Sequence, residues 1–230
     1  MKAGPEPSAS GPGEAGVPGR EASRRRRAVA MAGHMERDPA AGVRTARPAL
    51  ADPEPAVRAT ALGALARLGD LQLKDVQAAG ADRSPLVRSR AAELACRFGA
   101  AATAMLVGLL DDRRAEVVEA ACFGLGEIGP SAGDAAAREL GRVATDHSDP
   151  LCREAAVAAI GAIGAPAGLG AVLDAMGDKP AVRRRAVLAL AAFEGPDVDA
   201  ALEAALVDRD WQVRQAAEDL TGKRAGPATS

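Results

Sequence analysis

Few residues of this chain could do covalent or metal chemistry, because it holds only two histidines and three cysteines. His34 and His147 lie far apart, and neither is followed by Glu. Cys96, Cys122 and Cys152 form no CxxC pair, so their spacing suits neither a zinc site nor a disulfide framework. We therefore expect no catalytic residue, no metal and no cofactor, and we expect that the chain is not an enzyme.

A second set of residues recurs at a nearly constant interval. A small apolar residue returns about every 30 residues, at Val57, Val87, Val117, Cys152, Val182 and Val213. Asp stands five residues before it at Asp52, Asp82, Asp112 and Asp208, and Arg stands one residue after it at Arg58, Arg88, Arg153, Arg183 and Arg214. A repeat of this length predicts stacked units that bury apolar surface only against one another.

Each repeat predicts a pair of helices. Pro85 and Pro150 follow a residue that can cap a helix, and apolar residues then return at helical spacing until a glycine such as Gly69 or Gly164. A second apolar segment lies between that glycine and the next Asp. The expected fold is all-α, an α-α superhelix of about six helical hairpins over residues 40–222, in which Cys122 and Cys152 are core residues.

The phrase Asp-x-x-x-x-Val-Arg-x-x-Ala-x-x-x-Leu-x-x-Leu-Gly resembles the HEAT repeat, and most closely its phycobilisome-lyase type. The resemblance implies that the recurrent Asp and Arg form a ladder of hydrogen bonds between neighbouring repeats. Val118 replaces the Arg and His147 replaces the Asp, so we expect the ladder to be interrupted there. Some relatives are deoxyhypusine hydroxylases, but that activity needs His-Glu pairs, which this chain lacks.

The second helix of each hairpin is expected to line the concave face of the superhelix and to bind a protein partner. Candidate contacts are the positions that the core does not use, namely Arg90, Glu93, Arg97, Glu119, Phe123, Glu127, Glu154, Arg184, Arg185 and Leu188. Phe123 and Leu188 are the informative members, because exposed apolar groups rimmed by charge often mark partner contacts. Burial of both in the seam between repeats is an equally open alternative.

The two ends of the chain differ from the repeats. Residues 1–34 are rich in Gly, Pro and Arg, and we expect them to be a disordered tail, as are residues 223–230. The net charge of −2 makes nucleic acid an unlikely partner, because phosphate binding relies on clustered Lys and Arg. No apolar run approaches the roughly 18 residues that span a membrane, which favours a cytoplasmic protein with no membrane contact.

The sequence thus predicts a non-catalytic scaffold or regulatory adaptor, a monomeric array that binds a protein partner. The alternative is an accessory or lyase-type subunit that presents a prosthetic group to a client protein. Absorption of visible light by the purified protein would distinguish the two.

Overall fold

The computed structural model describes residues 18–223, and all of its regular elements are helical. Residues 1–17 and 224–230, for which we expect disorder, lie outside the described residues. The α-helices are α1 (Pro18–Ala32), α2 (Pro39–Ala46), α3 (Pro55–Arg67), α4 (Leu73–Gly80), α5 (Pro85–Ala95), α6 (Thr103–Leu109), α7 (Ala115–Ile128), α8 (Gly133–Asp146), α9 (Pro150–Ile163), α10 (Leu169–Ala175), α11 (Pro180–Leu190), α12 (Pro196–Ala205) and α13 (Trp211–Thr221). Short 3-10 turns are η1 (Pro48–Ala51), η2 (Cys96–Ala102), η3 (Gly129–Ala132) and η4 (Pro166–Gly168).

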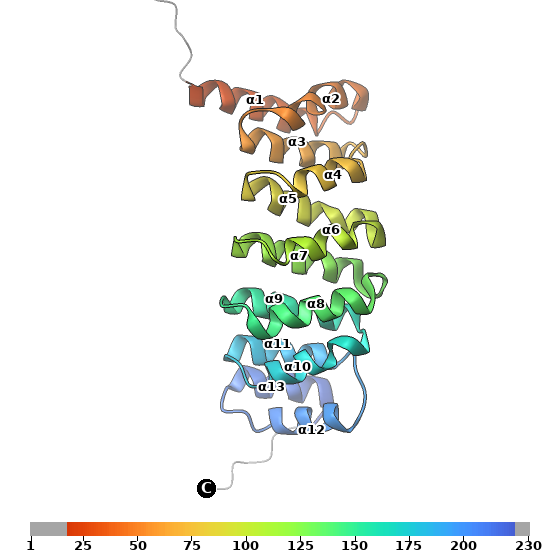
Figure 1. Ribbon diagram of the computed structural model, residues 1–230, viewed down its shortest axis with the longest axis vertical. Coiled ribbons are helices and arrows are strands. Elements are labelled where there is room, and N and C mark those ends of the chain that lie inside the picture. The colour runs from red at the N-terminus through yellow and green to blue at the C-terminus, as the bar shows by residue number, and fades with distance from the viewer. Residues whose placement is uncertain (1–17, 224–230) are drawn as a thin grey trace, which may run out of the picture.

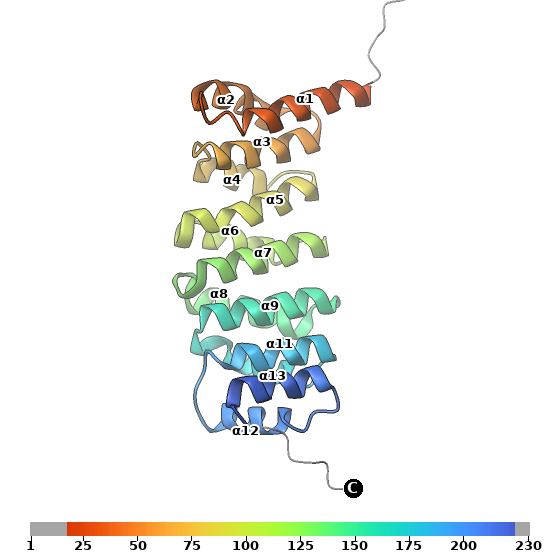
Figure 2. The same ribbon diagram turned by 180° about the vertical axis from the view of Figure 1, so that it is seen from behind.

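The helices stack as hairpins into one column (Figure 1). Helices α2 to α13 pair as first and second helices of six hairpins in the described chain, and each hairpin packs on the next. In the view from behind, the second helices α9, α11 and α13 lie in front of α8, α10 and α12 (Figure 2). The predicted all-α solenoid is confirmed.

Local sequence signals fix where the second helices begin and end. Proline occupies an early position in α3, α5, α9 and α11, where its missing N–H costs no intrahelical bond. Gly99 and Gly164 follow two of these helices, with φ of 54° and 66°. Residues that carry a Cβ rarely adopt this backbone conformation. The expected cap at Ser84 is absent, because its hydroxyl makes no capping bond, whereas Asp149 accepts from Leu151 N at 2.9 Å.

A seam of small residues joins the two helices of every hairpin. The recurrent alanines Ala61, Ala91, Ala121, Ala156, Ala186 and Ala217 are all fully buried. Small side chains at these positions allow close approach of the helices, and the seam continues from hairpin to hairpin without a separate globular centre.

A ladder of ion pairs crosses the loops between hairpins. Arg58 donates from Nε and Nη2 to the two oxygens of Asp82, at 2.8 and 2.7 Å, and from Nη1 to the carbonyl of Asp52 at 2.8 Å. Arg88 makes the same bonds to Asp112 and to the carbonyl of Asp82. Arg153 and Arg183 bind in the same way, so the predicted ladder is confirmed from Arg58 to Arg183. Arg214, by contrast, donates to the carbonyl of Asp208 in its own loop.

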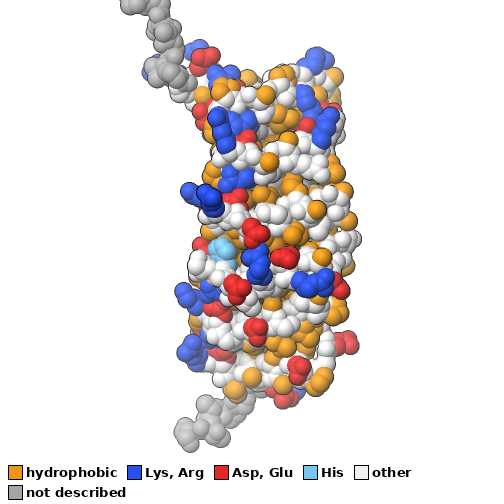
Figure 3. All heavy atoms as spheres, in the orientation of Figure 1, with side chains coloured by type: hydrophobic (Ala, Val, Ile, Leu, Met, Phe, Trp, Pro, Cys, Tyr) orange, Lys and Arg blue, Asp and Glu red, His pale blue; other side chains and the backbone are white. Residues whose placement is uncertain are grey.

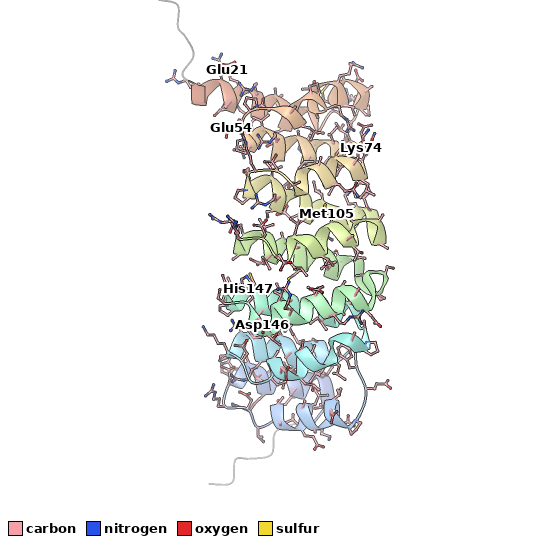
Figure 4. All side chains as sticks on the ribbon, viewed as in Figure 1. Glu21, Glu54, Lys74, Met105, Asp146 and His147 are labelled. Carbon is pink, nitrogen blue, oxygen red and sulfur yellow. The ribbon has the colours of Figure 1, made fainter. Side chains whose placement is uncertain are left out.

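One partner in the ladder differs from the sequence pattern, and the expected interruption is confirmed. The partner of Arg153 is Asp178, which stands four rather than five residues before Val182 and so falls outside the expected register. The ladder is interrupted at Val118, which is fully buried. At the matching loop, His147 lies at the end of α8 (Figure 4), and its Nδ1 accepts from Asp149 N at 3.1 Å. The imidazole thus takes over only the turn-forming role of the missing aspartate.

The expectation of a disordered tail over residues 1–34 is wrong for residues 18–34. Helix α1 packs on α3, and Val29, 4% exposed, belongs to a cluster with Val57 and Leu65, while Ala32 is 2% exposed. Arg25, from the run taken as a charged tail, donates to Asp52 at 2.8 and 3.2 Å and so begins the ladder. The first hairpin exposes an apolar side that another helix must cover, and α1 covers it.

One stretch, Pro85–Leu109, has the length and the apolar composition of a membrane span, contrary to the expectation that no apolar run is long enough. It is not a straight helix. Gly99 interrupts it with a positive φ, and the chain continues there from α5 of one hairpin to α6 of the next. Both parts contribute buried residues to the seam of the array, among them Ala91 and Leu106.

Helix α1 should stabilise the array. Val29→Asp should lower the free energy of unfolding by about 2 kcal/mol or more, because a charge would be buried without a partner. Ala28→Asp introduces the same charge at an exposed position of α1 and should change the free energy of unfolding by only about 0.5 kcal/mol. Urea titration of both variants measures the difference, and equal values would show that α1 does not pack on α3.

The ladder should also contribute to stability. Arg88 and Asp112 have side chains 17% and 8% exposed, so Arg88→Ala should cost about 1.5 to 3 kcal/mol through lost charged hydrogen bonds. The matched control is Arg142→Ala, which removes an ion pair whose side chains are 47% and 70% exposed. It should cost less than about 1 kcal/mol. Thermal or urea unfolding compares them, and an equal loss would contradict a structural role for the ladder.

Acid should weaken the ladder. Hydrogen bonds from Arg88 lower the pKa of Asp112, and Arg153 and Arg183 lower the pKa of Asp178 and Asp208 in the same way. A carboxyl whose pKa is lower in the folded state stabilises the fold above its unfolded pKa of about 3.9, and this contribution is lost as the pH falls further. The free energy of unfolding should therefore fall below about pH 4, less steeply in Asp112→Asn, and an unchanged slope in that variant would refute the role of Asp112.

Candidate functional site

The predicted contact residues lie together on the second helices. Arg90 and Glu93 lie on α5, Glu119, Phe123 and Glu127 on α7, Glu154 on α9, and Arg184, Arg185 and Leu188 on α11. Arg97 follows α5 in η2. These helices occupy successive levels of one side of the column, which we call the second-helix side (Figure 2). The opposite view of the surface shows charges of both signs interspersed with apolar groups (Figure 3).

A groove lies between α7 and α9 on the second-helix side. Its volume is 280 Å³, and we call it the alanine groove after its lining, which is Glu119, Cys122, Phe123, Gly126, Glu127, Ala155, Ala158, Ala159 and Ala162. Phe123 is 55% exposed, so burial in the seam is excluded for this residue. The groove therefore offers an apolar floor and one exposed aromatic wall to the solvent.

The depth of the alanine groove follows from small residues on both helices. A Cβ at Gly126 would lie 3.3 Å from the Cα of Ala159, so the glycine lets α7 and α9 approach closely. Glu119 and Glu127 stand on the rim at either end of the α7 lining, and both are exposed. An apolar floor between two carboxylates suits an apolar side chain flanked by cationic groups.

Helix α11 bounds the same region on its other side. Leu188 is 44% exposed, so it too lies outside the seam. Arg185 donates to Glu154 of α9 at 3.3 Å, which links two repeats across the surface. Arg185 and Glu154 are therefore partners of each other in this structure, whereas Arg184 makes no ion pair with any described residue.

The basic residues near the other end of the second-helix side form a separate group. Arg90 pairs with Glu93 of its own helix at 2.6 Å, and Arg97 donates to the carbonyl of Ala66 at 3.3 Å. Sequence analysis missed Arg26 and Arg67, which line a second groove beside Arg90. The sequence of α1 does carry a trace of the repeat. Arg25, Ala28 and Ala32 have the same spacing as Arg58, Ala61 and Leu65. Arg24, however, stands where the other repeats have a small apolar residue.

The cysteines behave as small core residues. Cys122 and Cys152 are buried, and burial raises the pKa of both thiols, that of Cys152 to about 11. Protonated thiols are poor nucleophiles, so their chemistry is suppressed. Among residues 18–223, no group of three His, Cys, Asp or Glu side chains is placed to hold a metal ion.

Comparison of whole chains shows the same fold in proteins of low sequence identity. An engineered protein covers 84% of this chain and 95% of its own, with 18% identity and a TM-score of 0.54. The complex of CpcE and CpcF of phycocyanin lyase from Nostoc sp. PCC7120 covers 64% of this chain and 96% of its own, with 19% identity and a TM-score of 0.53. A designed armadillo repeat protein in complex with the peptide (KR)4 covers 84% and 97%, with 16% identity and a TM-score of 0.51.

At the level of sequence, a search of curated proteins finds no match. The family model for HEAT repeats, however, matches residues 73–159 and 138–220, which is more than half of the chain. These matches coincide with hairpins whose ladder and alanine seam are described above. The chain belongs to the HEAT-repeat family.

Proposed function

We propose that this protein is a non-catalytic scaffold or adaptor that binds a protein partner through the second-helix side of its array. The observation that carries the proposal is the exposed Phe123 beside the alanine groove. A soluble array has no packing use for an aromatic side chain 55% exposed, whereas interfaces favour aromatic anchors next to pockets. Complexes of repeat proteins with a peptide or a second protein support the proposal by likeness of fold.

The groove also indicates the kind of segment that would bind. Its lining is apolar apart from Glu119 and Glu127, so a bound segment would place an apolar side chain against Phe123 and cationic groups near the two carboxylates. The alternative is a lyase-type subunit that presents a prosthetic group, and the visible absorption spectrum of protein purified from its own cells tests it directly. A bound chromophore would replace the scaffold proposal.

Phe123→Ala should weaken capture of the partner by about 2 kcal/mol, or about thirtyfold, without lowering the melting temperature, since the ring is largely exposed. The partner is first identified by photo-crosslinking from a benzophenone amino acid at Ala158 in the groove. Its affinity for the wild type and for the variant is then measured by calorimetry.

The control is Arg138→Glu, an exposed change on the first helix α8, which should leave the affinity unchanged. Arg184→Glu should mainly slow association and alter its salt dependence, as rim charges do. Arg185 is a poor choice for the same test, because its reversal would also break the pair with Glu154. If Arg138→Glu abolishes binding while Phe123→Ala does nothing, the partner binds elsewhere.

A further inference from the structure

The second-helix side changes sign along the column. Its first third, on α1, α3 and the region of α5, carries Arg26, Arg27, Arg67, Arg90 and Arg97 against Glu93. Its middle, on α7, carries the exposed Glu119 and Glu127, whereas Glu154 of α9 is paired with Arg185 of α11. Arg90, Glu93 and Arg97 belong to the site expected from the sequence. Arg67 of α3 does not, and Arg26 and Arg27 join them because α1 is a helix of the array.

A groove of 410 Å³ lies within this basic third, between α3 and α5 and beside α1. We call it the arginine groove, and its lining is Arg26, Ala56, Ala59, Thr60, Gly63, Arg67, Leu86, Ser89, Arg90 and Glu93. Leu86 is 52% exposed and gives the groove an apolar wall. Cationic and apolar groups are thus interleaved over three helices.

Two guanidinium groups of this region lie against glycines. A Cβ at Gly63 of α3 would lie 2.7 Å from Nη2 of Arg90, and a Cβ at Gly33, in the turn after α1, would lie 2.7 Å from Nη2 of Arg67. The absence of a side chain at each glycine leaves room for the end of the arginine beside it.

Two of these guanidinium groups have no acidic partner. Each ladder arginine from Arg25 to Arg183 is bonded to an aspartate, and Arg90 is bonded to Glu93. By contrast, Arg26 and Arg67 make no hydrogen bond or ion pair with any described residue. Arginine binds carboxylates in a bidentate manner, so an acidic ligand would supply the carboxylate partners that Arg26 and Arg67 lack.

We infer that the arginine groove binds an acidic segment of the partner protein, with carboxylates on Arg26 and Arg67 and an apolar residue against Leu86. A nucleic acid fits less well, because a phosphate backbone that continued along this side would meet the exposed carboxylates of Glu119 and Glu127. The inference rests on the proposed function and adds the direction in which the partner lies on the array. The acidic part of the partner lies over α1 to α5, and its basic and apolar part lies over α7 and α9.

The inference can be tested with a defined probe, a fluorescein-labelled octaglutamate peptide, by fluorescence anisotropy at low salt. The wild-type protein should bind it, and an octaglutamine peptide should not bind. The double variant Arg26→Glu with Arg67→Glu should weaken binding about tenfold or more, because it replaces both unpaired cations by anions. Its melting temperature should stay unchanged, since neither residue bonds to the rest of the array.

The matched control is Arg138→Glu with Arg209→Glu, which makes the same change of charge at exposed positions outside the groove. This control should alter the affinity by less than about twofold, apart from the general effect of net charge. Absence of octaglutamate binding, or equal weakening in both double variants, would overturn the inference. Stronger displacement of the peptide by an octathymidine oligonucleotide than by unlabelled octaglutamate would overturn it in favour of nucleic acid.

The same assay separates this inference from the proposed function. Phe123→Ala should leave octaglutamate binding unchanged, because Phe123 lies on α7 outside the arginine groove. If the peptide fails to bind while Phe123 still governs capture of the partner, only the acidic-segment inference is lost.

Discussion

The whole structure depends on one constraint, that no hairpin of this chain can bury its apolar face alone. Residues such as Val57, Val117 and Val182 are fully buried only because a neighbouring hairpin covers them. The constraint explains why α1 must be present, since the first hairpin would otherwise expose Val57 and Leu65. It also explains why one face of each second helix is free to bind a partner, because packing uses only the residues that face neighbouring helices.

The ion-pair ladder sets the geometry within that constraint. Loss of one member of such a pair is costly because its partner is left unsatisfied, and a bidentate guanidinium also accepts few alternative geometries. Each ladder arginine from Arg58 to Arg183 binds both its own loop and the next aspartate, so it fixes how one hairpin lies over the next. The pair is missing at Val118, so packing and a thiol hydrogen bond from Cys152 to the carbonyl of Ala115 join α7 and α9, the helices that form the alanine groove.

The two grooves use small residues for opposite purposes. In the alanine groove, Gly126 and the alanines of α9 lower the floor, so that Phe123 stands above it. In the arginine groove, Gly33 and Gly63 leave room for long cationic side chains to lie flat. The second-helix side is therefore apolar and acidic around α7 and basic around α1 to α5.

The sequence by itself determined the all-α repeat fold, the alanine seam and most of the ladder, because these depend on a period that recurs within the chain. It also singled out Phe123 and Leu188, since the helical spacing left them outside the core. Tertiary structure alone decided the order of residues 18–34, where Arg24 replaces the apolar anchor and contacts with α2 and α3 stabilise the helix. It likewise decided that Asp178 joins the ladder and that Arg26, Arg67 and Arg90 share a groove, because neighbouring hairpins place side chains together that no local pattern relates.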